Sequence, residues 1–140
     1  MTKKHVIVDT GPLVAFINRQ DTFHEWAIAQ FSLLLPPLLT CEAVLSESCF
    51  LLGHYTNGRQ SVLELVTRGL LRLPLEFEKE AGAIRDLLKR YENIPMSLAD
   101  GCLVRISEQI PDSVVCTLNA DFRIYRRNKR NTIPLLFPEP

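Results

Sequence analysis

The 140-residue sequence lacks long hydrophobic runs, and it lacks an excess of charge of either sign. No stretch approaches the roughly 18 uninterrupted apolar residues that a membrane-spanning helix needs. We therefore expect no contact with a membrane. The first apolar run, at residues 5–8, is also much shorter than the apolar region of a secretion signal. These absences predict a cytoplasmic protein.

Cysteines are few, and they are scattered along the chain without a C-x-x-C pair. A zinc site or a disulfide framework would favour closely spaced pairs and, for disulfides, an exported protein. We therefore expect buried free thiols at the four positions, which are Cys41, Cys49, Cys102 and Cys116.

Net charge is zero, because sixteen basic and sixteen acidic side chains cancel. The overall charge therefore neither favours nor excludes a nucleic-acid partner. The length is typical of one domain with its own core, and no repeat or low-complexity tract divides it. We expect residues 1–140 to form a single domain.

Short apolar runs alternate with longer helical patterns along the chain. This order indicates an α/β fold with a mostly parallel sheet and helices on both faces. In such sheets, ligands bind at the carboxyl ends of the strands. The strands are expected at 5–8, 38–40, 70–73, 114–117 and 133–137. The helices are expected at 12–17, 22–33, 41–52, 58–68, 77–91 and 97–109, with a short one opening at Asn119 or Asp121.

Three aspartates lie at positions where they could act at that edge of the sheet. Asp9 directly follows the first strand, although a turn or a helix cap would also explain an aspartate there. Asp100 belongs to a Ser-x-x-Asp capping box that begins at Ser97. Asp121 follows the strand at 114–117, with Asn119 as a natural N-cap before it. Each aspartate therefore has a local structural explanation beside the functional one.

Glu47 is expected in the middle of an apolar helix stripe, because residues 43–44 lie one turn before it and 50–51 one turn after. A buried, unpaired carboxylate costs several kcal/mol, so this position predicts a compensating arginine, proton or metal ion. A structural ion pair is the alternative. Glu42 falls on the opposite face and is expected to be solvated or to cap the helix.

Convergence of these acids at one cleft would be unfavourable without a cation, because each carboxylate raises the pKa of its neighbours. An oxygen-rich cluster without histidine suits Mg²⁺ or Mn²⁺. The sequence therefore predicts a divalent-metal site built from four residues, Asp9, Glu47, Asp100 and Asp121.

Four motifs in this order resemble the PIN domain, over nearly the whole chain. They are Val-Ile-Val-Asp-Thr-Gly-Pro around Asp9, Val-Leu-Ser-Glu at Glu47, Ser-Leu-Ala-Asp at Asp100 and Thr-Leu-Asn-Ala-Asp-Phe at Asp121. The resemblance implies a three-layer fold with a five-stranded, mostly parallel sheet. Many bacterial and archaeal members are VapC-type toxins, which are ribonucleases neutralised by an antitoxin.

The resemblance also implies roles at the site. Asp9, Glu47 and Asp100 take the dependable acidic positions and would bind Mg²⁺ or Mn²⁺, with Glu47 either acting on the attacking water or binding a second ion. The fourth position is less regular, because Asn119 replaces an aspartate and Asp121 remains. Whether Asp121 or Asn119 supplies the fourth ligand stays open. Two hydroxyl residues would hold the carboxylates, namely Thr10 and Thr117.

A basic segment follows Asp121 and contains no acidic residue. Such a cluster can bind the phosphates of single-stranded RNA, with a tyrosine stacked on a base. The alternatives are a solvated helix end or a surface for an acidic antitoxin tail. The residues expected to contact nucleic acid are Arg123, Tyr125, Arg126, Arg127, Lys129 and Arg130.

The sequence thus predicts a metal-dependent endoribonuclease, as the toxin of a toxin–antitoxin pair. A PIN-like RNA- or protein-binding module that cleaves weakly or not at all, and a housekeeping RNA-processing nuclease, remain alternatives. An aspartic protease is a further alternative, because Asp9-Thr10-Gly11 matches the signature of that family. The all-β fold of aspartic proteases argues against it, since this chain has several helical patterns. Candidate partners are RNA, an antitoxin and a second copy of the chain.

Overall fold

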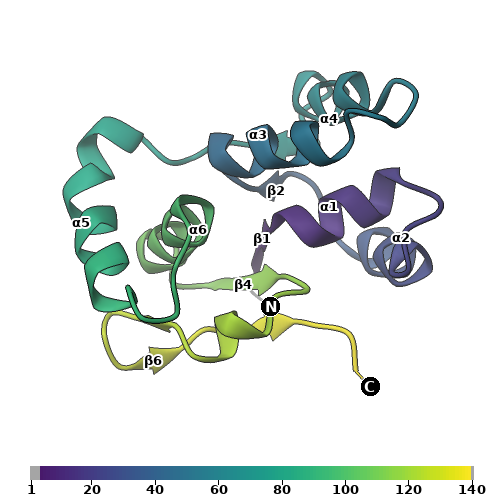
Figure 1. Cartoon of the computed structure of the whole chain (residues 1–140). Coiled ribbons are helices and arrows are strands. Elements are labelled where there is room, and N and C mark those ends of the chain that lie inside the picture. The colour runs from purple at the N-terminus through teal and green to yellow at the C-terminus, as the bar shows by residue number, and fades with distance from the viewer. Residues whose placement is uncertain (1–3, 140) are drawn as a thin grey trace.

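The computed structural model describes residues 4–139 and contains one parallel five-stranded sheet (Figure 1). The strand order is β3-β2-β1-β4-β7. The central strand β1 pairs with β2 and β4, so that Ile7 is aligned with Leu39 on one side and Val115 on the other. The strands are β1 (His5–Val8), β2 (Leu38–Leu39), β3 (Leu71–Arg72), β4 (Ser113–Cys116) and β7 (Leu135–Leu136).

Helices cover both faces of this sheet, which confirms the predicted α/β architecture. Figure 1 shows α5 and α6 on one side of strands β1 and β4, and α1 and α2 on the other. The helices are α1 (Thr10–Ile17), α2 (His24–Leu33), α3 (Glu42–Leu51), α4 (Gly58–Thr67), α5 (Phe77–Arg90) and α6 (Leu98–Gln109). A short 3₁₀ helix, η1 (Ala120–Arg123), follows β4.

The core lies around β1, β4 and α6. After their first residues, His5 and Ser113, strands β1 and β4 are buried apolar runs, as expected of parallel strands covered on both faces. Helix α6 packs against both strands and against α5, and most of its side chains are buried. A Cβ added at Gly101 would meet Ile84 and Leu88 of α5 at 3.3 Å, so glycine permits the close approach of the two helices. The first turn of α6 is thereby held firmly.

Two local predictions differ from the structure. Helix α2 begins at His24, and its N-cap Phe23 makes no side-chain cap bond, so the capping box predicted at Thr22 does not form. The basic segment forms a hairpin of β5 (Arg126–Arg127) and β6 (Asn131–Thr132), which the sequence analysis did not predict.

The free thiols expected from the cysteine pattern are confirmed, although Cys49 is half-buried and the other three are buried. Between residues 4 and 139, no helix is long and apolar enough to cross a membrane.

Candidate active site

A cavity of about 430 Å³ opens where β1 and β4 end. It brings together side chains from four elements that are distant in the sequence. Asp9 comes from the end of β1, Glu47 from α3, Asp100 from α6, and Asn119 and Asp121 from the segment after β4. The four acidic residues predicted from the sequence therefore line one cavity.

Asp9 is buried, and both of its carboxylate oxygens accept hydrogen bonds. Oδ1 accepts from the backbone N–H of Thr10 at 2.7 Å, and Oδ2 accepts from the hydroxyl of Thr117 at 2.7 Å. Burial raises the pKa of Asp9 to about 6, and the charges of Asp100 and Glu47 contribute to this rise while the two hydrogen bonds oppose it. Asp9 is also the N-cap of α1, so its local structural role is real.

Asp100 is buried on the first turn of α6. Its backbone N–H donates to Oγ of Ser97 at 3.0 Å, which confirms the predicted N-cap. Its Oδ2 accepts a hydrogen bond of 2.9 Å from the hydroxyl of Tyr125. Burial raises the pKa of Asp100, and the charge of Asp121 adds to the rise, whereas hydrogen bonds with Tyr125 and Ser97 oppose it. Asp100 therefore belongs to the capping box of α6 and also lines the cavity.

Glu47 reaches the cavity from an exposed part of α3, so the prediction of a buried glutamate is wrong. The buried position is the next residue, Ser48, which lies on the covered face with Val44. Phe50 is 83% exposed and Leu51 43% exposed, so this part of α3 is not covered by the core, and Leu51 lines the cavity beside Glu47. The apolar stripe of α3 is therefore only partly covered.

Asn119 and Asp121 are half-buried and belong to one turn. The side-chain oxygen of Asn119 accepts from the N–H of Asp121 at 3.0 Å, which confirms Asn119 as the N-cap of η1. The N–H of Asn119 in turn donates to the hydroxyl oxygen of Thr117 at 2.9 Å. Thr117 thereby connects the fourth acidic position to Asp9.

A family model for the PIN domain matches residues 6–128. The chain belongs to the PIN domain family. Among solved structures, the crystal structure of Mycobacterium tuberculosis VapC20, a sarcin–ricin loop cleaving toxin, matches with a TM-score of 0.67 and 18% identity. The match covers 79% of this chain and 86% of that chain, and it shows a shared fold. No curated protein sequence matches the chain.

The donor groups of this PIN domain fit a water-rich divalent cation. Within residues 4–139, no three acidic, histidine or cysteine side chains form a closed metal cage. Mg²⁺ does not need one, since it is usually held by one or two carboxylates and keeps several waters. The buried pair Asp9 and Asp100 supplies such ligands, and the buried hydroxyl of Thr10 has no partner in the same cavity wall. Thr10 holds Asp9 through its backbone, not through its hydroxyl as expected.

The basic segment of the PIN domain does not form the surface expected from the sequence. Tyr125 has no exposed surface and therefore cannot stack on a base. Arg126 donates to three backbone carbonyls at the end of η1, and Arg127 donates to Ser113 at the start of β4. Arg123, beside Asp121, is exposed and lies over the ring of Phe137 at 4.5 Å. The remaining basic residues, Lys129 and Arg130, are exposed in the hairpin loop.

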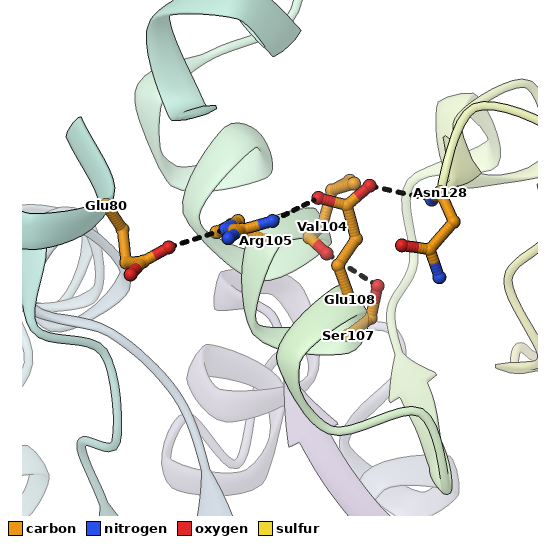
Figure 2. Close-up of polar contacts among 6 residues, drawn as sticks. All are labelled: Glu80, Val104, Arg105, Ser107, Glu108 and Asn128. Atoms are coloured by element: carbon orange, nitrogen blue, oxygen red, sulfur yellow. Dashed lines mark hydrogen bonds and ion pairs between the residues drawn. The ribbon is translucent and has the colours of Figure 1, made fainter. Parts of the chain in front are cut away.

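The hairpin is attached to α6 through the polar contacts in Figure 2. Glu108 accepts a 2.7 Å hydrogen bond from the backbone N–H of Asn128 and pairs with Arg105 at 3.1 Å, and Arg105 also pairs with Glu80 of α5 at 2.7 Å. Glu108 is eight residues beyond Asp100, or about 12 Å along a helix. The loop bearing Lys129 is therefore attached to α6 about two turns beyond Asp100.

Proposed function

We propose that this PIN domain is a metal-dependent endoribonuclease that hydrolyses RNA phosphodiester bonds with Mg²⁺ or Mn²⁺. The observation that carries the proposal is the pair of buried carboxylates, Asp9 and Asp100, in one open cavity with Glu47 and Asp121. Burying two acids near each other costs free energy that their hydrogen bonds offset only in part, since neither is paired with a basic side chain within residues 4–139. A bound cation would offset that cost.

The residues that line the cavity would have different roles in the reaction. Asp9 and Asp100 would hold the cation, which when bound polarises the scissile phosphate and lowers the pKa of its water ligands. Glu47 stands exposed in the same wall, so its carboxylate is free to accept a proton from the attacking water or to hold a second ion. Asp121 and the carbonyl of Asn119 supply further oxygens, although that carbonyl also caps η1.

RNA would approach through the open side of the cavity. Arg123 is the basic residue best placed to bind a phosphate there, because it is exposed and lies two residues after Asp121. Lys129 and Arg130 lie at the hairpin loop, where they could contact only a longer strand. Arg126 and Arg127 are occupied by hydrogen bonds to the protein's own backbone.

The biological setting that we propose is a toxin–antitoxin pair. The shared fold with a toxin of known structure supports this proposal, and a housekeeping RNA-processing nuclease is the competing assignment. Expression in a bacterial host should arrest growth, and the product of the adjoining gene should relieve the arrest. Growth at the normal rate with active protein present would favour the processing nuclease.

A second copy of the chain stays a candidate partner. Analytical ultracentrifugation would show whether the protein forms a dimer.

The decisive experiment is cleavage of labelled single-stranded RNA. We expect cleavage in Mn²⁺ or Mg²⁺ that stops with EDTA. In Asp9→Asn or Asp100→Asn, cleavage should fall by more than the roughly 10- to 100-fold that is typical when only a group holding a metal ligand is lost. Asp86→Asn is the matched control, because Asp86 is an exposed aspartate on α5. Full cleavage in EDTA would refute the metal mechanism. RNA binding without cleavage in either metal would instead identify a binding module.

A further inference from the structure

Tyr125 does not line the acidic cavity, but its hydroxyl contacts Asp100, which does. The ring is enclosed by Phe122 and Tyr91, each with its ring centroid 5.1 Å away and in an edge-on orientation. The hydroxyl donates to Oδ2 of Asp100 at 2.9 Å. Ser97, the N-cap of α6, also stabilises the Asp100 carboxylate through hydrogen bonds, and it lies on the same turn, whereas Tyr125 comes from the segment after β4. The tyrosine therefore holds one oxygen of a proposed metal ligand.

A carboxylate bound at one oxygen has its rotation restricted. The backbone of Asp100 is already fixed, since Ser97 caps α6 at that residue. The tyrosine hydroxyl adds the restraint that the backbone cannot supply, because it sets the rotation of the carboxyl plane. Groups that hold ligands in this way typically change metal affinity by about 10- to 100-fold when they are removed.

The segment that carries Tyr125 is itself fixed at several points. The N–H of Arg126 donates to the hydroxyl of Tyr91 at 2.9 Å. Further along, the N–H of Asn128 donates to Glu108, which Arg105 holds in place (Figure 2). The contacts in Figure 2 therefore clamp the hairpin onto α6, the same helix that presents Asp100. Asp100 and the segment that carries Tyr125 are therefore both attached to α6.

We propose that Tyr125 is a positioning residue that orients the Asp100 carboxylate for metal binding, and that the Glu108 clamp keeps Tyr125 in place. The proposal rests on the proposed function, since it concerns the same metal site. Tyr125 has no exposed surface, so it contacts neither RNA nor the reacting phosphate. Its effect must pass through Asp100.

The test compares Tyr125→Phe with Tyr91→Phe. Each variant removes one tyrosine hydroxyl from the same aromatic cluster, but only Tyr125 bonds a carboxylate. Mn²⁺ binding is measured directly, by titration with electron paramagnetic resonance and without RNA. We expect Tyr125→Phe to weaken Mn²⁺ binding about tenfold and Tyr91→Phe to weaken it less, because Tyr91→Phe loosens the segment at Arg126 but leaves the bond to the carboxylate in place.

Kinetics give the second readout. In Tyr125→Phe, we expect kcat to fall at limiting Mn²⁺, to recover at saturating Mn²⁺, and the KM for RNA to stay the same. A raised KM with normal Mn²⁺ affinity would overturn the proposal, because it would place the tyrosine in RNA binding. Unchanged Mn²⁺ affinity in a folded variant would overturn it as well.

A second pair of variants tests the clamp without altering the aromatic cluster. Glu108→Ala frees the hairpin backbone, whereas Glu80→Ala also releases Arg105 but leaves Asn128 bonded. We expect weaker Mn²⁺ binding in Glu108→Ala only. If Tyr125→Phe fails to fold, wild-type affinity in Glu108→Ala overturns the proposal. Wild-type protein that neither binds Mn²⁺ nor cleaves RNA refutes the proposed function itself, and the positioning role with it.

Discussion

The hydroxyl of Thr117 donates a 2.7 Å hydrogen bond to Oδ2 of Asp9, although 108 positions separate the two residues in the chain. The same hydroxyl oxygen accepts from the N–H of Asn119 at 2.9 Å. One side chain at the end of β4 therefore orients the acid at the end of β1 and the turn that carries Asp121.

Replacing Thr117 should affect both stability and metal binding. Thr117→Val leaves a buried carboxylate oxygen and the Asn119 N–H without this partner, so we expect a loss of about 1–3 kcal/mol in the free energy of unfolding. Thr40→Val is the matched control, because Thr40 is equally buried and its hydroxyl donates to the carbonyl of Val8. Urea unfolding and Mn²⁺ titration should show destabilisation in both variants but weaker metal binding only in Thr117→Val.

The buried charge of Asp9 should make the metal-free protein less stable at neutral pH. The pKa of about 6 in the folded protein lies above the ordinary aspartate value of 3.8, so folding is penalised once the carboxyl ionises. The penalty is absent below pH 3.8, grows between 3.8 and 6, and reaches at most about 3 kcal/mol above that range. Asp9→Asn should therefore be the more stable protein at pH 7.5 in EDTA, with the advantage vanishing near pH 4.

Urea unfolding at the two pH values measures this difference. Adding Mn²⁺ should then reverse the order at pH 7.5, because binding to the folded state stabilises the wild type by an amount that grows with the logarithm of the Mn²⁺ concentration above Kd. A wild type that is more stable than Asp9→Asn in EDTA at pH 7.5 would show that the hydrogen bonds of Asp9 outweigh its burial.

Restoring an acid at position 119 should strengthen the site. Asn119→Asp keeps a side-chain oxygen for the N–H of Asp121 and adds a negative charge beside the cavity. We expect Mn²⁺ to bind several-fold more tightly and the metal-free protein to lose stability through repulsion with Asp121. Calorimetric titration and a melting curve in EDTA measure the two effects, and weaker Mn²⁺ binding would argue against a ligand at this position.

Salt dependence should separate the basic residues. Arg123→Ala should weaken binding of single-stranded RNA and reduce the slope of log affinity against log salt by about 0.7, the value for one phosphate contact. Lys129→Ala should change the slope less on a short RNA, since Lys129 lies in the hairpin loop clamped beside Glu108. Fluorescence anisotropy over a range of salt, in a metal-free buffer, measures both. Equal slopes for the two variants would place RNA along the hairpin as well.

Much of the candidate site was predictable because its signals are local. Asp9 directly follows an apolar strand, and the N-caps Ser97 and Asn119 precede Asp100 and Asp121 by three and two residues. Hydrogen bonds of this range form within one turn, so residue order alone indicates them. The order of strands and helices was predictable for the same reason, because each element carries its own apolar periodicity.

The exposure of Glu47 and the burial of Tyr125 were decided by tertiary structure. Periodicity shows that part of α3 is apolar, but only packing decides which arc is covered, and here the arc with Phe50 is left exposed. Tyr125 follows Phe122 by about one turn, an apolar spacing that the arginines around it obscure. Both rings are fully buried against each other, and the Tyr125 hydroxyl bonds Asp100. Sequence alone thus determined the elements and the acids at their ends. Burial of a side chain depends on partners distant in the chain, so only the fold decided which groups hold those acids.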